Sequence, residues 1–264
     1  MNRTLRGNLR AAAASGEMAL RSNVMDSFVL FGLLVQPLII AVLALWMLEA
    51  RGENYAIYVV IGSGLTGLWS TLLFVSGNGI TSERWTGTLE SLTSVPTPMS
   101  WIIMGKTIAN VTQSLVSMVA AYTLASLLFG YPLTVTQPVP FLISIVFMVL
   151  SFVAFGMLIA PAFVLNPDVQ RWQNAMEFPV YILAGFLFPI ALLPGWTTPL
   201  SYLLAPYWAA RALHITSSLQ GGTTEVLASW GMMVVLAAIY LVIARRLFRL
   251  TLQRARQDAS LGMQ

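Results

Sequence analysis

The chain has 264 residues, of which 57% are hydrophobic and 9% are charged, and its formal net charge is +4. A soluble domain carries about one-quarter charged residues, so this composition excludes a water-soluble globular protein and predicts an all-α integral membrane protein. The chain contains no cysteine and one histidine. This excludes a disulfide framework, a thiol nucleophile and a cysteine-based metal site, and we expect no cofactor or metal bound by this chain.

The first 26 residues predict a cytoplasmic amphipathic helix rather than a signal peptide. The apolar segment starts only at Ser27 and has no small-residue cleavage pattern. Upstream, apolar and small residues recur at helical intervals among arginines, at Leu5, Leu9, Ala12, Gly16 and Leu20. We expect this helix to lie in the inner headgroup layer, as a plain anchor or as a contact for a partner.

Charge-free stretches long enough to cross a bilayer, about 20 residues each, predict six transmembrane helices within a single domain over 27–248. The expected spans are 27–48, 55–77, 107–129, 141–163, 175–193 and 226–244. The remaining 249–264 form a basic cytoplasmic tail, which we expect to meet anionic lipid headgroups.

The basic residues orient these spans. With the N-terminus inside, only Arg51 and Arg211 of the 14 basic residues fall on the outer side, which is a strong positive-inside signal. We therefore expect a multi-pass protein of the cell (inner) membrane with both termini cytoplasmic. The net charge then needs no nucleic acid as a partner.

The segment between the second and third spans is Glu83-Arg84-Trp85-Thr86-Gly87-Thr88-Leu89-Glu90-Ser91-Leu92, followed by Pro96-Thr97-Pro98. On a helix over about 81–94, Trp85, Leu89 and Leu92 share an apolar face, while Glu83, Gly87 and Glu90 lie on a polar face. The run resembles the cytoplasmic coupling segment of ABC-2 type transporter permeases, E-R-E-x-G-T-L-E-x-L, with Trp85 where the second Glu is common.

This resemblance implies how the segment is used. Glu83, Arg84 and Glu90 would contact an ATPase subunit, and Gly87 would allow close approach beside Thr88. Trp85, Leu89 and Leu92 would transmit the motion into the bundle. It also implies a pair of ATPase subunits that hold ATP and Mg²⁺, a second permease copy or a related permease, a prokaryotic cell membrane, and an N-terminal helix that contacts the ATPase.

A second resemblance lies after the fifth span. The segment over about 185–210 is apolar but interrupted by proline and glycine, as in Gly185-Phe186-Leu187-Phe188-Pro189 and Leu193-Pro194-Gly195-Trp196. Broken backbone at membrane depth requires surrounding protein or a wet cavity, so we expect a re-entrant outer segment. ABC-2 type permeases carry such a piece between spans five and six.

Two alternative chemistries find little support. Met104-Gly105-Lys106-Thr107 resembles the end of a P-loop, but Ser100 replaces its first glycine; we expect Lys106 to reach the lipid headgroups. His214 is expected to be interfacial, and Asp168 and Glu177 to lie at the inner end of span five with a structural role. The absence of carboxylates from the other spans argues against ion coupling.

Aromatic and small polar residues of spans two and five are candidates to line a substrate path: Trp69, Phe74, Ser76, Asn78, Tyr181, Phe186 and Phe188. Such side chains suit an amphiphilic guest of the drug, antibiotic or lipid kind, although ordinary helix packing or lipid contact is the better explanation for any single one of them. Export of a polysaccharide or lipid-linked glycan is the alternative within the family. Outside the family, the alternatives are an ATP-independent channel or carrier and a membrane sensor.

Overall fold

The computed structural model describes residues 3–31, 35–48, 53–85, 87, 97–129, 135–165, 168–186, 190–218 and 222–261, which contain helices and turns but no strand. The α-helices are α1 (Arg3–Met25), α2 (Ser27–Leu30), α3 (Gln36–Leu48), α4 (Glu53–Thr71), α5 (Thr81–Trp85), α7 (Met99–Phe129), α8 (Pro138–Val164), α9 (Val169–Leu183), α10 (Thr198–Tyr202), α11 (Ala205–Ser218) and α12 (Thr223–Leu261). A π-helical turn (Leu72–Ser76) and a 3₁₀ turn (Gly77–Gly79) follow α4, and two more 3₁₀ turns, Ile190–Leu192 and Gly195–Thr197, precede α10.

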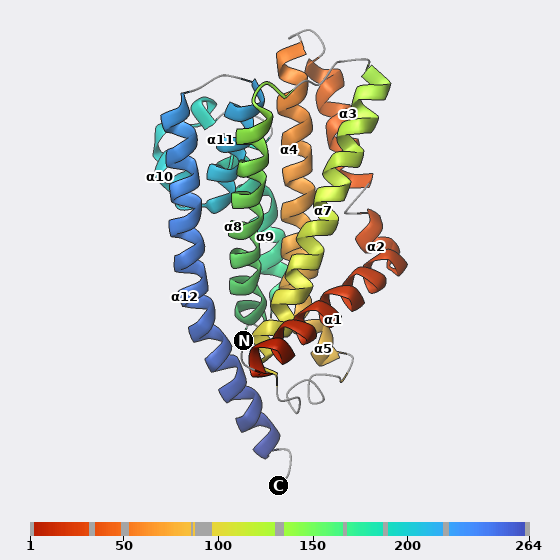
Figure 1. Cartoon of the computed structure of the whole chain (residues 1–264), viewed down its shortest axis with the longest axis vertical. Coiled ribbons are helices and arrows are strands. Elements are labelled where there is room, and N and C mark those ends of the chain that lie inside the picture. The colour runs from red at the N-terminus through yellow and green to blue at the C-terminus, as the bar shows by residue number, and fades with distance from the viewer. Residues whose placement is uncertain are drawn as a thin grey trace.

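The long helices form one elongated bundle (Figure 1). Helices α3, α4, α7, α8 and α12 run along its long axis, and α10 and α11 lie toward the upper end. At the lower end, α1 crosses α7 obliquely, α5 lies beside this crossing, and both chain termini are found. The N-terminal helix, α5 and the two termini therefore share one end of the molecule.

Three helical segments in the described part of the chain are long and apolar enough to cross a membrane: Ile57–Gly79, Pro138–Val164 and Thr223–Thr251. They coincide with the second, fourth and sixth predicted spans. The other three spans, and the orientation of all six, stay predictions.

The helix at the fifth predicted span differs from the expected 175–193. Helix α9 begins earlier, at Val169, and ends at Leu183. Gly185 then adopts a φ of +67°, a left-handed conformation that glycine reaches without steric cost and that commonly ends helices. From Ile190 onward the described chain continues as short 3₁₀ and α-helical pieces, so the broken segment expected after span five begins inside that predicted span.

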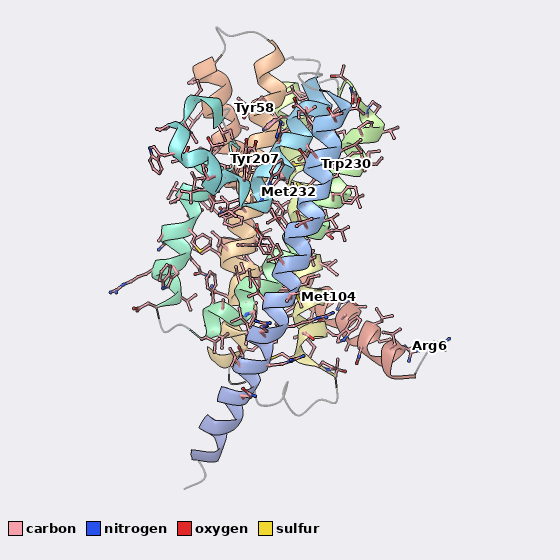
Figure 2. All side chains as sticks on the ribbon, turned by 90° about the vertical axis from the view of Figure 1, so that its left-hand side faces the viewer. Arg6, Tyr58, Met104, Tyr207, Trp230 and Met232 are labelled. Carbon is pink, nitrogen blue, oxygen red and sulfur yellow. The ribbon has the colours of Figure 1, made fainter. Side chains whose placement is uncertain are left out.

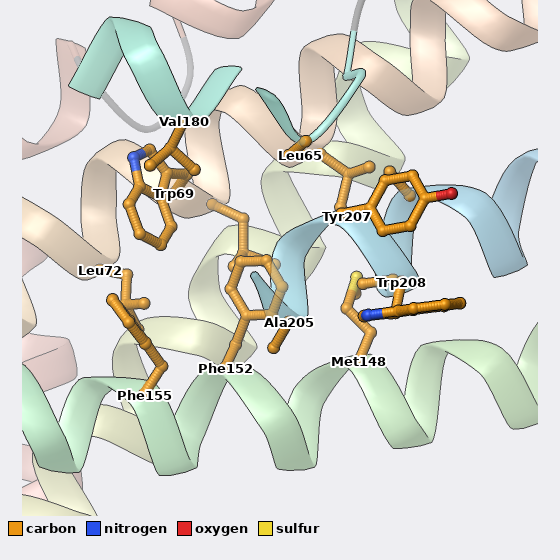
Figure 3. Packing of buried hydrophobic residues seen from close by; sticks show 14 of the residues in the cluster. Leu65, Trp69, Leu72, Met148, Phe152, Phe155, Val180, Ala205, Tyr207 and Trp208 are labelled. Carbon is orange, nitrogen blue, oxygen red and sulfur yellow. The ribbon is translucent and has the colours of Figure 1, made fainter. Parts of the chain in front are cut away.

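The core lies where α4, α8, α9 and α11 meet, and large side chains fill it (Figure 3). The indole of Trp69 has no exposed surface, and its ring centroid lies 5.1 Å from that of Phe155 and 6.5 Å from that of Phe152. Figure 3 shows Val180 of α9 against the same indole. Packing of this kind holds α9 beside α4 at mid-length of the bundle.

Candidate functional site

The predicted coupling segment is only partly helical. Helix α5 ends at Trp85, and Gly87 has a φ of +71°, which an α-helix does not allow. The expectation of one continuous helix over 81–94, with a single apolar face from Trp85 to Leu92, is therefore wrong, because the backbone turns at Gly87. Nothing in the described chain lies within 4 Å of a Cβ built at Gly87, so its left-handed turn, and not a close approach among the described residues, is what requires glycine here.

Several residues predicted for ATPase contact lie outside the described residues: Thr88, Leu89, Glu90 and Leu92, and the side chains of Arg84 and Trp85. Their predicted roles stay predictions.

Glu83 does not simply extend outward from α5. Its carboxylate pairs with the ammonium group of Lys106 on α7, and both side chains are about four-fifths buried, with 18% and 19% exposure. The expectation that Lys106 reaches the lipid headgroups is wrong, because a closer anion is available. The P-loop alternative also fails on geometry, because Gly105 and Lys106 lie within the continuous helix α7, where the backbone N–H groups are already used.

The N-terminal helix is packed against the bundle through small residues. Gly16 on α1 and Gly105 on α7 allow the two backbones to touch: a Cβ built at Gly105 would lie 2.0 Å from the carbonyl oxygen of Ala12. The hydroxyl of Ser15 donates to the Ile102 carbonyl oxygen of α7 at 3.0 Å. Part of the face expected to meet lipid therefore meets protein, although Leu9 on that face remains 44% exposed.

A chain of side-chain amides continues inward from this crossing. Asn23, at the end of α1, donates to Asn110 Oδ1 at 2.8 Å and to Gln113 Oε1 at 3.0 Å, both on α7. Asn110 in turn donates from Nδ2 to the hydroxyl of Ser76 at 3.0 Å. Asn23, Asn110 and Ser76 are all buried. These bonds join α1 to α7, and α7 to the π-helical turn that follows α4.

The π-helical turn leaves a backbone carbonyl oxygen available to accept a hydrogen bond, and a side chain of α9 donates to it. The N–H of Gly77 bonds to the Leu72 carbonyl oxygen, five residues back, which is the π pattern rather than the α pattern. The buried side chain of Gln173 donates from Nε2 to the Leu73 carbonyl oxygen at 2.9 Å and to Asn78 Oδ1 at 3.0 Å. Turns of this kind often mark functional hinges, and here one carries side-chain bonds from two neighbouring helices.

A buried carboxyl group lies one turn further along α9. Glu177 is 9% exposed, and its Oε1 accepts hydrogen bonds from the hydroxyls of Ser70 at 2.7 Å and Tyr181 at 2.9 Å. The Ser70 and Tyr181 hydroxyls also contact each other. Because α9 begins at Val169, Glu177 lies in the middle of the helix and not at its inner end. The expectation that Glu177 lies at the inner end of span five is therefore wrong.

The residues predicted to line a substrate path lie mostly within the packed core. Trp69 and Phe186 have no exposed surface and Ser76 has 1%, while Phe74 and Asn78 are half-buried. Ser76, Asn78 and Tyr181 belong to the hydrogen-bonded groups described above. Phe188 lies outside the described residues. The indole N–H of Trp69 is buried and finds no acceptor among the described residues.

Aromatic side chains also organise the other end of the bundle. Tyr58, Tyr207 and Trp230 lie in its upper half, whereas Arg6 and Met104 lie in its lower half (Figure 2). His214, expected at the interface, is 9% exposed and stacks on Tyr58, with ring centroids 3.6 Å apart. The Tyr58 hydroxyl donates to the Gly185 carbonyl oxygen at 2.9 Å, so this stack supports the turn that ends α9.

This arrangement identifies a helical membrane protein with a hydrogen-bonded polar layer between its N-terminal helix and α9. The family model described as the ABC-2 type transporter matches residues 19–216. The chain therefore belongs to the ABC-2 type transporter family, and the resemblance carried by the segments around Gly87 and Pro189 is confirmed. A search of curated proteins finds no match to this chain.

Proposed function

We propose that this protein is the membrane subunit of an ATP-driven exporter that moves an amphiphilic substrate across or out of the bilayer. Family membership supports a transport subunit. In this proposal a pair of separate ATPase subunits supplies the energy, and a second copy or a related permease completes the pathway. The basic residues support cytoplasmic termini, because only two of the 14 fall on the opposite side.

The observation that carries the proposal is the placement of α1 and α5 at one end of the bundle, both joined to the interior. Helix α5 is tied to α7 by the pair Glu83–Lys106, and α1 is tied to α7 and the π turn through Asn23 and Asn110. Motion imposed on that end by an ATPase would reach α4 and α9 directly. A simple anchor has no need of this connection.

Copurification tests the proposal. The tagged chain is expressed with its neighbouring genes and purified in mild detergent. We expect a stoichiometric ATPase subunit to copurify, and Glu90→Arg to remove it while the chain itself remains folded. A second permease in the complex would indicate a heterodimer.

The alternatives give different outcomes. If the chain purifies alone and transports in liposomes without ATP, it is a channel or carrier and the proposal is wrong. If it purifies with an ATPase but moves a lipid-linked glycan in inverted vesicles, the glycan-export alternative within the family replaces the drug-like substrate.

A further inference from the structure

We propose that Glu177, with Ser70 and Tyr181, is a recognition site for the positive charge of an organic cation. The inference rests on the proposed transport function and adds a substrate class to it: lipophilic amines and related onium compounds. The sequence alone did not suggest this, because Glu177 was expected at the inner end of span five with a structural role.

The missing counter-charge of Glu177 is the first observation that supports this site. Four ion pairs join described residues, namely Arg21–Glu17, Lys106–Glu83, Arg171–Asp168 and Arg211–Glu225. Glu177 belongs to none of them, and its hydrogen bonds within the described chain come from neutral hydroxyls. A buried carboxylate is costly without an opposite charge, and ionisable groups within membrane segments commonly mark substrate or ion pathways. A bound cation would supply the missing charge.

The depth of Glu177 within the apolar part of the bundle also supports this site. Ser70, which bonds to Glu177, lies two residues from the middle of the apolar segment Ile57–Gly79. At 1.5 Å per residue this is about 3 Å from the midpoint of that segment. The carboxyl group is therefore far from the headgroups that could neutralise it, and a ligand that reaches it must itself be soluble in the bilayer.

The hydrogen-bonding geometry of the Glu177 carboxyl group supports this site as well. Both printed hydrogen bonds end on Oε1, and Oε2 accepts none from the residues that the structure describes. One oxygen is therefore held in place by Ser70 and Tyr181, while the other keeps its full acceptor capacity. This leaves a fixed carboxyl group with one oxygen that accepts no hydrogen bond from the described residues.

The aromatic side chains that pack around Tyr181 are the last observation that supports this site. The Tyr181 ring lies 5.8 Å from that of Phe178 and 6.0 Å from that of Phe186. Phe178 is 64% exposed, so the outer surface of α9 carries an aromatic side chain that contacts Tyr181, the hydrogen-bond donor to Glu177. Aromatic rings attract cations through their negative faces and offer apolar contact area. A carboxylate with aromatic neighbours suits a bulky lipophilic cation better than a small metal ion.

Direct binding to two ions of similar shape and opposite charge tests the site. The purified chain in nanodiscs of neutral phosphatidylcholine is equilibrated with radiolabelled tetraphenylphosphonium or with tetraphenylborate. We expect saturable binding of the cation and weaker binding of the anion. Glu177→Gln keeps the shape of the side chain and removes its charge, and it should weaken cation binding by about tenfold or more. The control Glu225→Gln removes a surface carboxylate that already pairs with Arg211 and should leave binding unchanged.

Two further variants separate charge from packing. Ser70→Ala and Tyr181→Phe each remove one hydrogen bond to Glu177 but keep its charge, so they should reduce cation binding much less than Glu177→Gln does. Equal binding of both ions by the wild type, unchanged cation binding in Glu177→Gln, or equal losses in all three variants would overturn the proposal. This assay contains no ATPase, and Glu177→Gln should still copurify with one. Failure of cation recognition is thus distinguishable from failure of the transport function.

Discussion

The glycine contact between α1 and α7 leads to a quantitative prediction for Gly105→Ala. A Cβ at this position would lie 2.0 Å from the carbonyl oxygen of Ala12 and 2.5 Å from the hydroxyl oxygen of Ser15. Ordinary contacts begin near 3.4 Å, so α1 must move away by about 1.4 Å. The backbone oxygen belongs to a helix, and no side-chain rotation can relieve this contact.

The expected cost follows from three terms. Overpacking a close contact costs about 1–3 kcal/mol, and the displaced helix weakens the Ser15 hydrogen bond to Ile102, worth about 0.5–1.5 kcal/mol. Replacing glycine by alanine inside a helix returns about 1 kcal/mol. We therefore expect Gly105→Ala to lower the free energy of unfolding by about 0.5–3.5 kcal/mol.

Thermal unfolding in detergent measures this effect. Gly231→Ala is the matched control, because Gly231 lies in α12 and nothing is found within 4 Å of its built Cβ. The apparent melting temperature should fall in Gly105→Ala and stay level or rise in Gly231→Ala. If the two variants melt together, α1 does not pack on α7 through this glycine.

Three other changes test the coupling region and α9 in the same thermal assay or in a transport assay. Gln173→Leu removes the donor to the π turn and should cost about 1–3 kcal/mol of stability, whereas Gln170→Leu on the exposed face of the same helix should cost little. Gly87→Ala should cost about 1 kcal/mol because its φ is positive, and Gly87→Asn should cost less; identical melting of all three proteins would contradict the left-handed turn. Glu83→Lys and Lys106→Glu should each reduce ATP-driven transport, and the double variant should recover it, since the reversed pair keeps opposite charges.

Much of the fold was predictable from composition because long uncharged segments are rare outside membranes. The three described segments that are long and apolar enough to cross a membrane, Ile57–Gly79, Pro138–Val164 and Thr223–Thr251, coincide with predicted spans. The amphipathic pattern of the first 26 residues also predicted the helix α1 correctly. These features depend on local sequence, so a window of residues is enough to detect them.

The polar interior was not predictable in the same way. Asn23, Asn110 and Gln173 carry no charge, so a search for charged breaks overlooks them. Their partners are between 34 and 100 residues away in sequence. Glu83 and Lys106 lie 23 residues apart on different helices, so a local sequence pattern does not reveal their pairing. Glu177 was misplaced because the fifth span was predicted to begin only at 175, whereas α9 begins at Val169 among polar residues.

The π turn over Leu72–Ser76 also fixes the angular phase of the segment after it. A residue in an α-helix advances about 100° around the axis, so deletion of one residue from this turn would restore regular helix and rotate Asn78 and Glu83 by about that angle. Gln173 and Lys106 would then face the wrong side of the chain. Most membrane helices absorb a single-residue deletion by sliding along their axis. Here the same deletion would separate α5 from the bundle. The number of residues in the π turn is therefore as constrained as the identity of their side chains.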